Sequence, residues 1–129
     1  MKKQSRKYLL LFALWVCLIF VLTSIPKAGG ISPFPHFDKV AHFSVYFVAG
    51  FLFSRYLREE GKNRESILII TIFVISLVGG IDEIHQRWIS GRVCSIYDWI
   101  ADMAGGAGGA FVVVASHRLR ELFPSPKNE

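Results

Sequence analysis

The sequence predicts an all-α fold, a bundle of four transmembrane helices. The composition is 52% hydrophobic and the mean hydropathy is +0.39, which is too apolar for a small soluble domain that must cover its surface with polar groups. Four long apolar segments lie along the chain, and each is long enough to cross the hydrocarbon core of a bilayer. The length of 129 residues fits one domain. Residues 1–129 are therefore interpreted as a single integral membrane domain.

The first helix is expected at about residues 8–25. This apolar run spans ~27 Å at ~1.5 Å per residue, which matches the membrane core, and Pro26 ends it. A basic start followed by an apolar run is also typical of a cleaved signal peptide. The run is longer than the apolar region of most signal peptides, and Pro26-Lys27-Ala28 is a poor cleavage site. We therefore favour a retained helix.

The other three helices are expected at about residues 38–57, 66–86 and 97–117. The loop at 58–65 is charged and contains a glycine, and Ser66 is a suitable N-cap for the third helix. The fourth apolar segment passes through a glycine-rich stretch that runs from Gly105 to Gly109. These connections are short, so consecutive helices should cross the membrane in opposite directions.

The distribution of lysine and arginine predicts the orientation of the bundle. One side of the membrane receives eleven of these residues, in the N-terminal segment, the loop between the second and third helices, and the C-terminal tail. The other side receives four, namely Lys27, Lys39, Arg87 and Arg92. The positive-inside rule then predicts that the N and C termini are cytoplasmic. Because the basic residues flank membrane segments and do not share one face, the net charge of +5 does not indicate nucleic-acid binding.

Ionisable side chains interrupt the apolar segments near the outer end of every helix except the first: Asp38, His42, Asp82, Glu83, Asp98 and Asp102. Such groups are costly inside a membrane unless they face the bundle interior, a partner or water. A single acid at a helix start could be structural, because negative charge is favoured there. Taken together, the acids favour a functional site that faces outward.

Helical spacing indicates which of these residues share a face. Asp38, His42 and Tyr46 are four residues apart and form one stripe. Gln86 lies four residues after Asp82 and three after Glu83, so it can contact either carboxylate.

Asp98 and Asp102 share a face with Gly105 and Gly109. The two glycines form a GxxxG motif, which allows a neighbouring backbone to approach closely. The spacing therefore predicts that both aspartates point into the bundle.

Asp82 and Glu83 lie at the C-terminal end of their helix, where negative charge is disfavoured. Arg92, Lys39, a metal ion or a shared proton could compensate them. Because two adjacent carboxylates do not both ionise cheaply, one is expected to keep a proton or to share a cation.

An ordered set of residues runs from Leu22 to Gly109: Ser24, Pro26, Asp38-Lys39-Val40-Ala41-His42-Phe43, Tyr46, Asp82-Glu83-Ile84-His85-Gln86, Arg92, Asp98 and Gly105-Gly106. With this set the chain resembles the VanZ-like family of membrane proteins, whose namesake is linked to resistance to the glycopeptide antibiotic teicoplanin. The resemblance implies a role in the cell envelope. Two positions depart from the family pattern, which usually has asparagine where Asp102 stands and a proline within the Ile89-Ser90-Gly91 loop.

The predicted site has two groups of residues. The catalytic candidates are His42, Asp82, Glu83 and Asp98; the substrate-binding candidates are Ser24, Asp38, Tyr46, Gln86, Arg92 and Asp102. In an enzyme, His42 and one carboxylate would perform acid–base chemistry on a lipid-linked headgroup while Arg92 binds its phosphate. In a binding protein, the same site would hold an amphipathic ligand or a partner protein without turnover. The sequence leaves both alternatives open.

No cofactor is predicted, since the chain has no nucleotide, haem or zinc-protease motif. A divalent metal ion remains an alternative, held by Asp38, His42, Asp98 and one of the adjacent carboxylates Asp82 and Glu83. The expected partner is a membrane lipid or a lipid-linked envelope precursor, and homo-oligomerisation is left open. The expected location is the bacterial plasma membrane, which the chain crosses several times.

Overall fold

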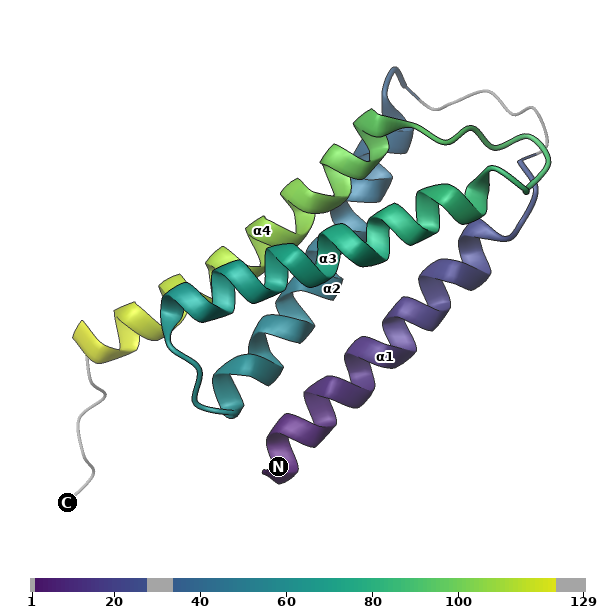
Figure 1. Cartoon of the computed structure of the whole chain (residues 1–129). Helices are drawn as coiled ribbons and strands as arrows, with labels where there is room; N and C mark the ends of the chain where they lie inside the picture. Colours follow the sequence, from purple (N-terminus) through teal and green to yellow (C-terminus); the bar gives the residue numbers. More distant parts are fainter. Residues whose placement is uncertain (1, 28–33, 123–129) are drawn as a thin grey trace.

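The structure is a computed structural model that describes residues 2–27 and 34–122. Within these ranges the chain forms four helices and no strand, as Figure 1 shows: α1 (Lys3–Thr23), α2 (Phe37–Glu59), α3 (Arg64–Gln86) and α4 (Ile96–Leu122). Each helix is long and apolar enough to cross a membrane, and in α4 this holds for Ile96–Ser116. The predicted all-α fold with four membrane-length helices is therefore confirmed.

The helix ends differ from the predicted ones by a few residues. α1 begins at Lys3, five residues before the predicted start, because the helix continues through its basic flank, where the Ser5 hydroxyl donates to the Lys2 carbonyl at 2.8 Å. α3 begins at Arg64 and not at a cap made by Ser66. The cap is Asn63, whose side chain accepts from the Ser66 backbone N–H at 2.8 Å. An apolar run marks the membrane span, whereas the helix itself ends where its free backbone groups find partners.

The bundle is centred on α2, which contacts the other three helices, while α1 lies mainly against α2. Its interior is filled by side chains that include Ile19, Tyr46, Phe53 and Ile75. Large apolar side chains such as Leu14, Ile69 and Phe111 are exposed on the outside, as expected for helices that face lipid tails.

Different segments of the chain lie at the two ends of the bundle (Figure 1). The start of α1, the α2–α3 loop and the end of α4 lie at one end. The end of α1, the start of α2 and the α3–α4 loop lie at the other end. We call this second end the polar end, because the six ionisable residues predicted to line the site belong to the helix turns that lie there.

The contact between α2 and α4 is made by glycines. A Cβ atom at Gly105 would meet the Phe43 carbonyl oxygen, and one at Gly109 would meet the Phe47 carbonyl oxygen. On α2, a Cβ atom at Gly50 would meet the backbone of Gly106. The predicted close approach of a neighbouring backbone to the GxxxG motif is confirmed, and the neighbour is α2.

Candidate functional site

Four of the predicted acids are buried at the polar end. Asp82 and Asp102 have no exposed surface, and Glu83 and Asp98 are 3% and 7% exposed. The prediction that Asp98 and Asp102 point into the bundle is confirmed. Buried carboxylates need hydrogen-bond donors or cations around them, and the structure supplies these donors from α1, α2, α3 and the α3–α4 loop.

Asp82 faces α1 and α2. The Thr23 hydroxyl donates to Asp82 Oδ1 at 2.6 Å, and the Tyr46 hydroxyl donates to Oδ2 at 3.4 Å. The Gln86 side-chain amide donates to the same Oδ2 at 3.0 Å. Thr23 was not among the predicted site residues. Its only signal in the sequence is a hydroxyl at the outer end of the first apolar segment, next to Ser24.

Glu83 faces α4 and the loop that precedes it. The Ser95 backbone N–H donates to Glu83 Oε2 at 2.7 Å, and Gln86 donates to Oε1 at 3.4 Å. His42 Nδ1 lies 3.9 Å from the same Oε1. Gln86 thus contacts both adjacent carboxylates, as its spacing predicts. Ser95 contributes its backbone, which no side-chain motif could have revealed.

His42 is held by Asp102. The distance from His42 Nδ1 to Asp102 Oδ1 is 2.8 Å, which links α2 to α4. The other carboxylate oxygen, Oδ2, has no hydrogen-bond partner in the described part of the chain. It lies against Gly79 of α3, where an added Cβ atom would come within 2.9 Å of it. The absence of a side chain at Gly79 therefore leaves the space that Asp102 occupies.

Lys39 forms a second link between the same helices. Its ammonium group lies 2.7 Å from Asp38 Oδ2 and 2.8 Å from Asp98 Oδ1. Lys39 was considered a possible counter-ion for the acids at the end of α3. The structure assigns it instead to the acids in the first turns of α2 and α4.

Arg92, one of the possible counter-ions for Asp82 and Glu83, forms no ion pair with either residue in the described part of the chain. Its guanidinium group donates to the Ile25 carbonyl at 3.1 Å and to the Leu22 carbonyl at 2.8 Å. Leu22 belongs to the last turn of α1 and Ile25 follows the C-cap, so the guanidinium group lies at the C-terminal end of the helix, where a positive charge is favourable. Arg92 therefore ties the α3–α4 loop to α1, and it reaches the site from the rim.

Ser24 lies outside the cluster. Its hydroxyl donates to the Phe20 carbonyl at 2.6 Å and lies 3.4 Å from His85 Nε2. The residue is exposed and lines neither of the cavities described next. Of the predicted site residues it is the one that the structure leaves apart from the others.

Two cavities meet at the polar end. One, of about 270 Å³, lies between α1 and α2, and its apolar walls include Ile19, Leu22 and Val45. The other, of about 300 Å³, lies under the α3–α4 loop and is lined mainly by polar residues, among them Gln86 and Ser95. The two cavities share four lining residues: Lys27, Asp38, His42 and Arg92. An apolar space and a polar space therefore adjoin at His42.

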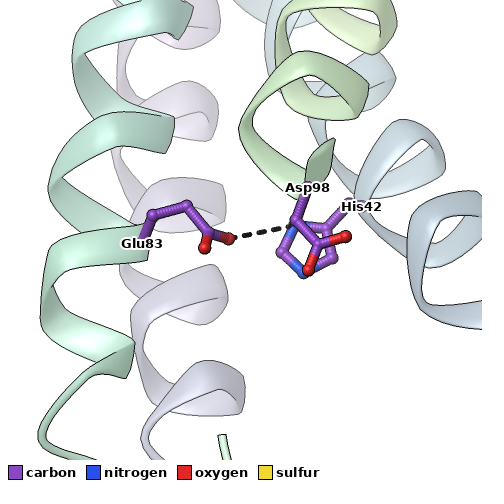
Figure 2. A group of neighbouring side chains, drawn as sticks. All are labelled: His42, Glu83 and Asp98. Carbon is purple, nitrogen blue, oxygen red and sulfur yellow. Dashed lines mark ion pairs between the residues drawn. The ribbon is translucent and has the colours of Figure 1, made fainter. Parts of the chain in front are cut away.

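Three potential metal ligands come together at the inner wall of the site. The side chains of His42, Glu83 and Asp98, from α2, α3 and α4, point toward one another (Figure 2). One ligand atom from each lies within 4.8 Å of the others. An imidazole beside two carboxylates can exchange protons or bind a cation.

The comparisons with known proteins give one match. A family model described as VanZ/LLP1 matches residues 3–117, which is nearly the whole chain. No curated protein and no solved structure gives a significant match.

Proposed function

The chain belongs to the VanZ/LLP1 family, and we propose that this membrane protein binds a lipid-linked molecule of the bacterial cell envelope. The headgroup would occupy the polar cavity under the α3–α4 loop, and the lipid chain would occupy the apolar cavity between α1 and α2. The membrane would be the bacterial plasma membrane, with both termini cytoplasmic and the polar end facing outward.

The observation that carries this proposal is the pair of adjoining cavities. An amphipathic ligand needs an apolar surface and a polar surface in one continuous site. The two cavities share Lys27, Asp38, His42 and Arg92, so a ligand that crosses between them passes these four side chains. Lysine and arginine at the junction are the residues that recognise phosphate. A phosphate between an apolar chain and a polar headgroup is therefore the chemistry that the site fits best.

Such binding would account for a resistance phenotype. The family resemblance links such proteins to resistance to a glycopeptide antibiotic of the teicoplanin type, and we propose that the antibiotic acts on the same lipid-linked precursor. A protein that holds or alters the headgroup of such a precursor would reduce what the antibiotic can bind. This role in resistance is part of the proposal.

Acid–base processing of the headgroup is a second candidate, favoured by one contact. The hydrogen bond of 2.8 Å from His42 Nδ1 to Asp102 fixes the orientation of the imidazole ring and leaves Nε2 as the nitrogen that can exchange a proton with a ligand. A histidine oriented by a buried carboxylate is suited to general acid–base catalysis.

The proposal is tested by comparing bacteria with and without the protein. His42→Gln, Asp82→Asn and Glu83→Gln should lower glycopeptide resistance by about tenfold, since each removes a charged hydrogen-bond partner. The lipid extract is analysed in parallel. A headgroup that differs between cells with and without the unmodified protein supports processing. If the two extracts are the same and the unmodified protein still confers resistance, binding alone is supported. Glu65→Gln is the control, because Glu65 is an exposed acid at the opposite end of α3. Full resistance of all three variants at normal membrane levels would make the site structural.

The outward orientation is tested with Cys94, an exposed free thiol in the α3–α4 loop. A membrane-impermeant thiol reagent added to intact cells should label it. Cys17, the other free cysteine, lies within α1 and is replaced by alanine so that it gives no signal. Labelling that requires permeabilised cells would reverse the orientation and remove the basis for an outward-facing site.

A further inference from the structure

The polar end contains more buried negative charge than its described cations balance. The buried carboxylates are Asp82, Glu83, Asp98 and Asp102. The basic side chains that contact them in the described ranges are Lys39, which is shared with Asp38, and His42, which is charged only when protonated. An uncompensated charge is costly in a membrane interior, so a bound cation would stabilise this arrangement.

Asp102 contains a buried carboxylate oxygen that no donor or cation compensates in the part of the chain that the structure describes. Asp102 has no exposed surface, and its Oδ2 lacks a hydrogen-bond partner among the described residues. Its other oxygen holds His42 Nδ1 at 2.8 Å. A carboxylate that binds one nitrogen of an imidazole is also the usual neighbour of a histidine that binds metal through its other nitrogen. Asp102 thus leaves His42 Nε2 available for a ligand.

The geometry beside His42 suits a single ion. The ligand atoms of His42, Glu83 and Asp98 lie within 4.8 Å of one another, and the three side chains converge (Figure 2). Ligands bound at about 2.0–2.2 Å from a metal lie roughly 3–4.4 Å apart. The His42 nitrogen that lies 3.9 Å from Glu83 Oε1 is Nδ1, so the side chains would rotate to present Nε2 to the ion. The three residues come from three different helices, and an ion between them would join α2, α3 and α4.

We propose that His42, Glu83 and Asp98 bind one divalent cation of the Mn²⁺ or Zn²⁺ type, and that this cation binds a phosphate oxygen of the lipid-linked ligand. One imidazole with two carboxylates is a donor set that these ions accept, whereas Ca²⁺ and Mg²⁺ prefer oxygen alone. Three protein ligands leave at least one coordination position for a ligand atom. The part that concerns phosphate rests on the proposed function.

The surroundings of the three ligands fit a phosphate. His42 and Asp98 line the polar cavity of about 300 Å³, together with Lys27 and Arg92. A phosphate bound to the cation would thus have basic side chains on its other side. Lys39 can remain on Asp38, with which it already pairs at 2.7 Å, when the cation takes Asp98.

The cation site is tested on the full-length protein, purified in detergent and freed of metal with a chelator. Titration with MnCl₂, followed by the electron paramagnetic resonance of free Mn²⁺, should show one saturable site per chain. ZnCl₂ should compete for it, and MgCl₂ should compete weakly. Absence of saturable Mn²⁺ and Zn²⁺ binding at sub-millimolar concentrations would overturn the proposal, and it requires no variant.

Variants separate ligation from general attraction of a cation. Glu83→Gln and Asp98→Asn each remove a ligand and should weaken Mn²⁺ binding by more than about 100-fold, the upper end of the loss expected when only a partner of a ligand is removed. Asp82→Asn removes the same charge from the neighbouring position, whose carboxylate bonds to Thr23 and Tyr46, so it should weaken binding much less. Equal losses in Asp82→Asn and Glu83→Gln would mean diffuse attraction and would overturn the site. Only variants that keep a monodisperse, cooperatively unfolding protein are compared.

A second measurement separates this inference from the proposed function. Farnesyl phosphate is the probe, and farnesol, which lacks the phosphate, is the matched control. Mn²⁺ should tighten binding of farnesyl phosphate by at least tenfold and leave farnesol unchanged. Equal binding of farnesyl phosphate with and without chelator would overturn the cation link while leaving lipid binding intact. Saturable Mn²⁺ binding without binding of either probe would support the cation site and contradict the proposed function.

Discussion

The contact between α2 and α4 has two parts that are built in opposite ways. In the middle of the membrane span, Gly50, Gly105 and Gly109 bring the two backbones into direct contact. At the polar end, the charged side chains of Lys39, His42, Asp98 and Asp102 fill the space between the same helices. One part excludes every side chain, and the other part consists of side chains that are costly to bury.

This difference indicates where stability and function are expected. Lipid tails are as apolar as leucine, so helices in a membrane associate through close packing and hydrogen bonds. The glycine contact supplies close packing. Buried ion pairs, in contrast, recover little more than their own desolvation cost. The glycine part should therefore contribute most of the net stability of the pair. Substitutions in the polar part that leave no buried group unpaired should change stability little and function strongly.

The largest effect is expected in the glycine part. Gly105→Leu or Gly109→Leu should destabilise the bundle by about 3 kcal/mol or more, because the new side chain meets backbone atoms of α2 that cannot move aside. Thermal unfolding in detergent measures the loss. Gly80→Ala is the control, since its Cβ atom would meet only Trp99 Nε1, at 3.5 Å. It should be neutral or slightly stabilising. Leucine variants that accumulate and melt like the parent would contradict the comparison.

The sequence predicted that Asp98, Asp102 and the two glycines of the GxxxG motif share one face of α4, because this follows from spacing along one helix. The 4-3-4 spacing from Asp98 to Gly109 depends only on helical geometry, and so does the contact of Gln86 with both carboxylates. The four membrane spans follow equally from apolar length.

The contacts between elements were harder to predict. Thr23 reaches Asp82 across 59 positions, and Arg92 reaches the Leu22 carbonyl across 70. No local pattern records which carbonyl or carboxylate a loop will meet. Pairing of Arg92 with the acids, one of the alternatives that the sequence left open, relied on charge alone, whereas the carbonyls at the end of α1 also attract a cation. The packing of the helices decided between these partners.

A smaller effect is expected for two hydrogen bonds outside the α2–α4 contact, one at the polar end and one away from it. Thr23→Val removes the 2.6 Å bond to Asp82 and should cost about 2 kcal/mol, as for a bond to a charged group. Thr71→Val removes the 2.9 Å bond between Thr71 and Ser54, which is buried away from the polar end, and should cost about 1 kcal/mol. Unfolding measures both costs, and binding of farnesyl phosphate should fall only in Thr23→Val. A similar fall in both variants would mean that binding follows stability.

The smallest effect is expected for Asp102→Asn, which introduces the residue that the VanZ-like family usually has at this position. The asparagine carbonyl can still accept from His42 Nδ1, as Asp102 Oδ1 does at 2.8 Å. The amide then takes the place of Oδ2, which has no partner in the described ranges. Since a buried charge is removed while its hydrogen bond remains, the free energy of unfolding should change by less than about 1 kcal/mol.

Asp102→Leu is the matched comparison for this substitution. It removes the hydrogen bond as well as the charge and leaves His42 without its partner, so it should cost about 3 kcal/mol. If Asp102→Asn is as harmful as Asp102→Leu, the negative charge itself is required. His42 and Asp102 would then form an ion pair between α2 and α4 whose loss destabilises the bundle, and the polar part of this contact would contribute to stability as much as the glycine part does.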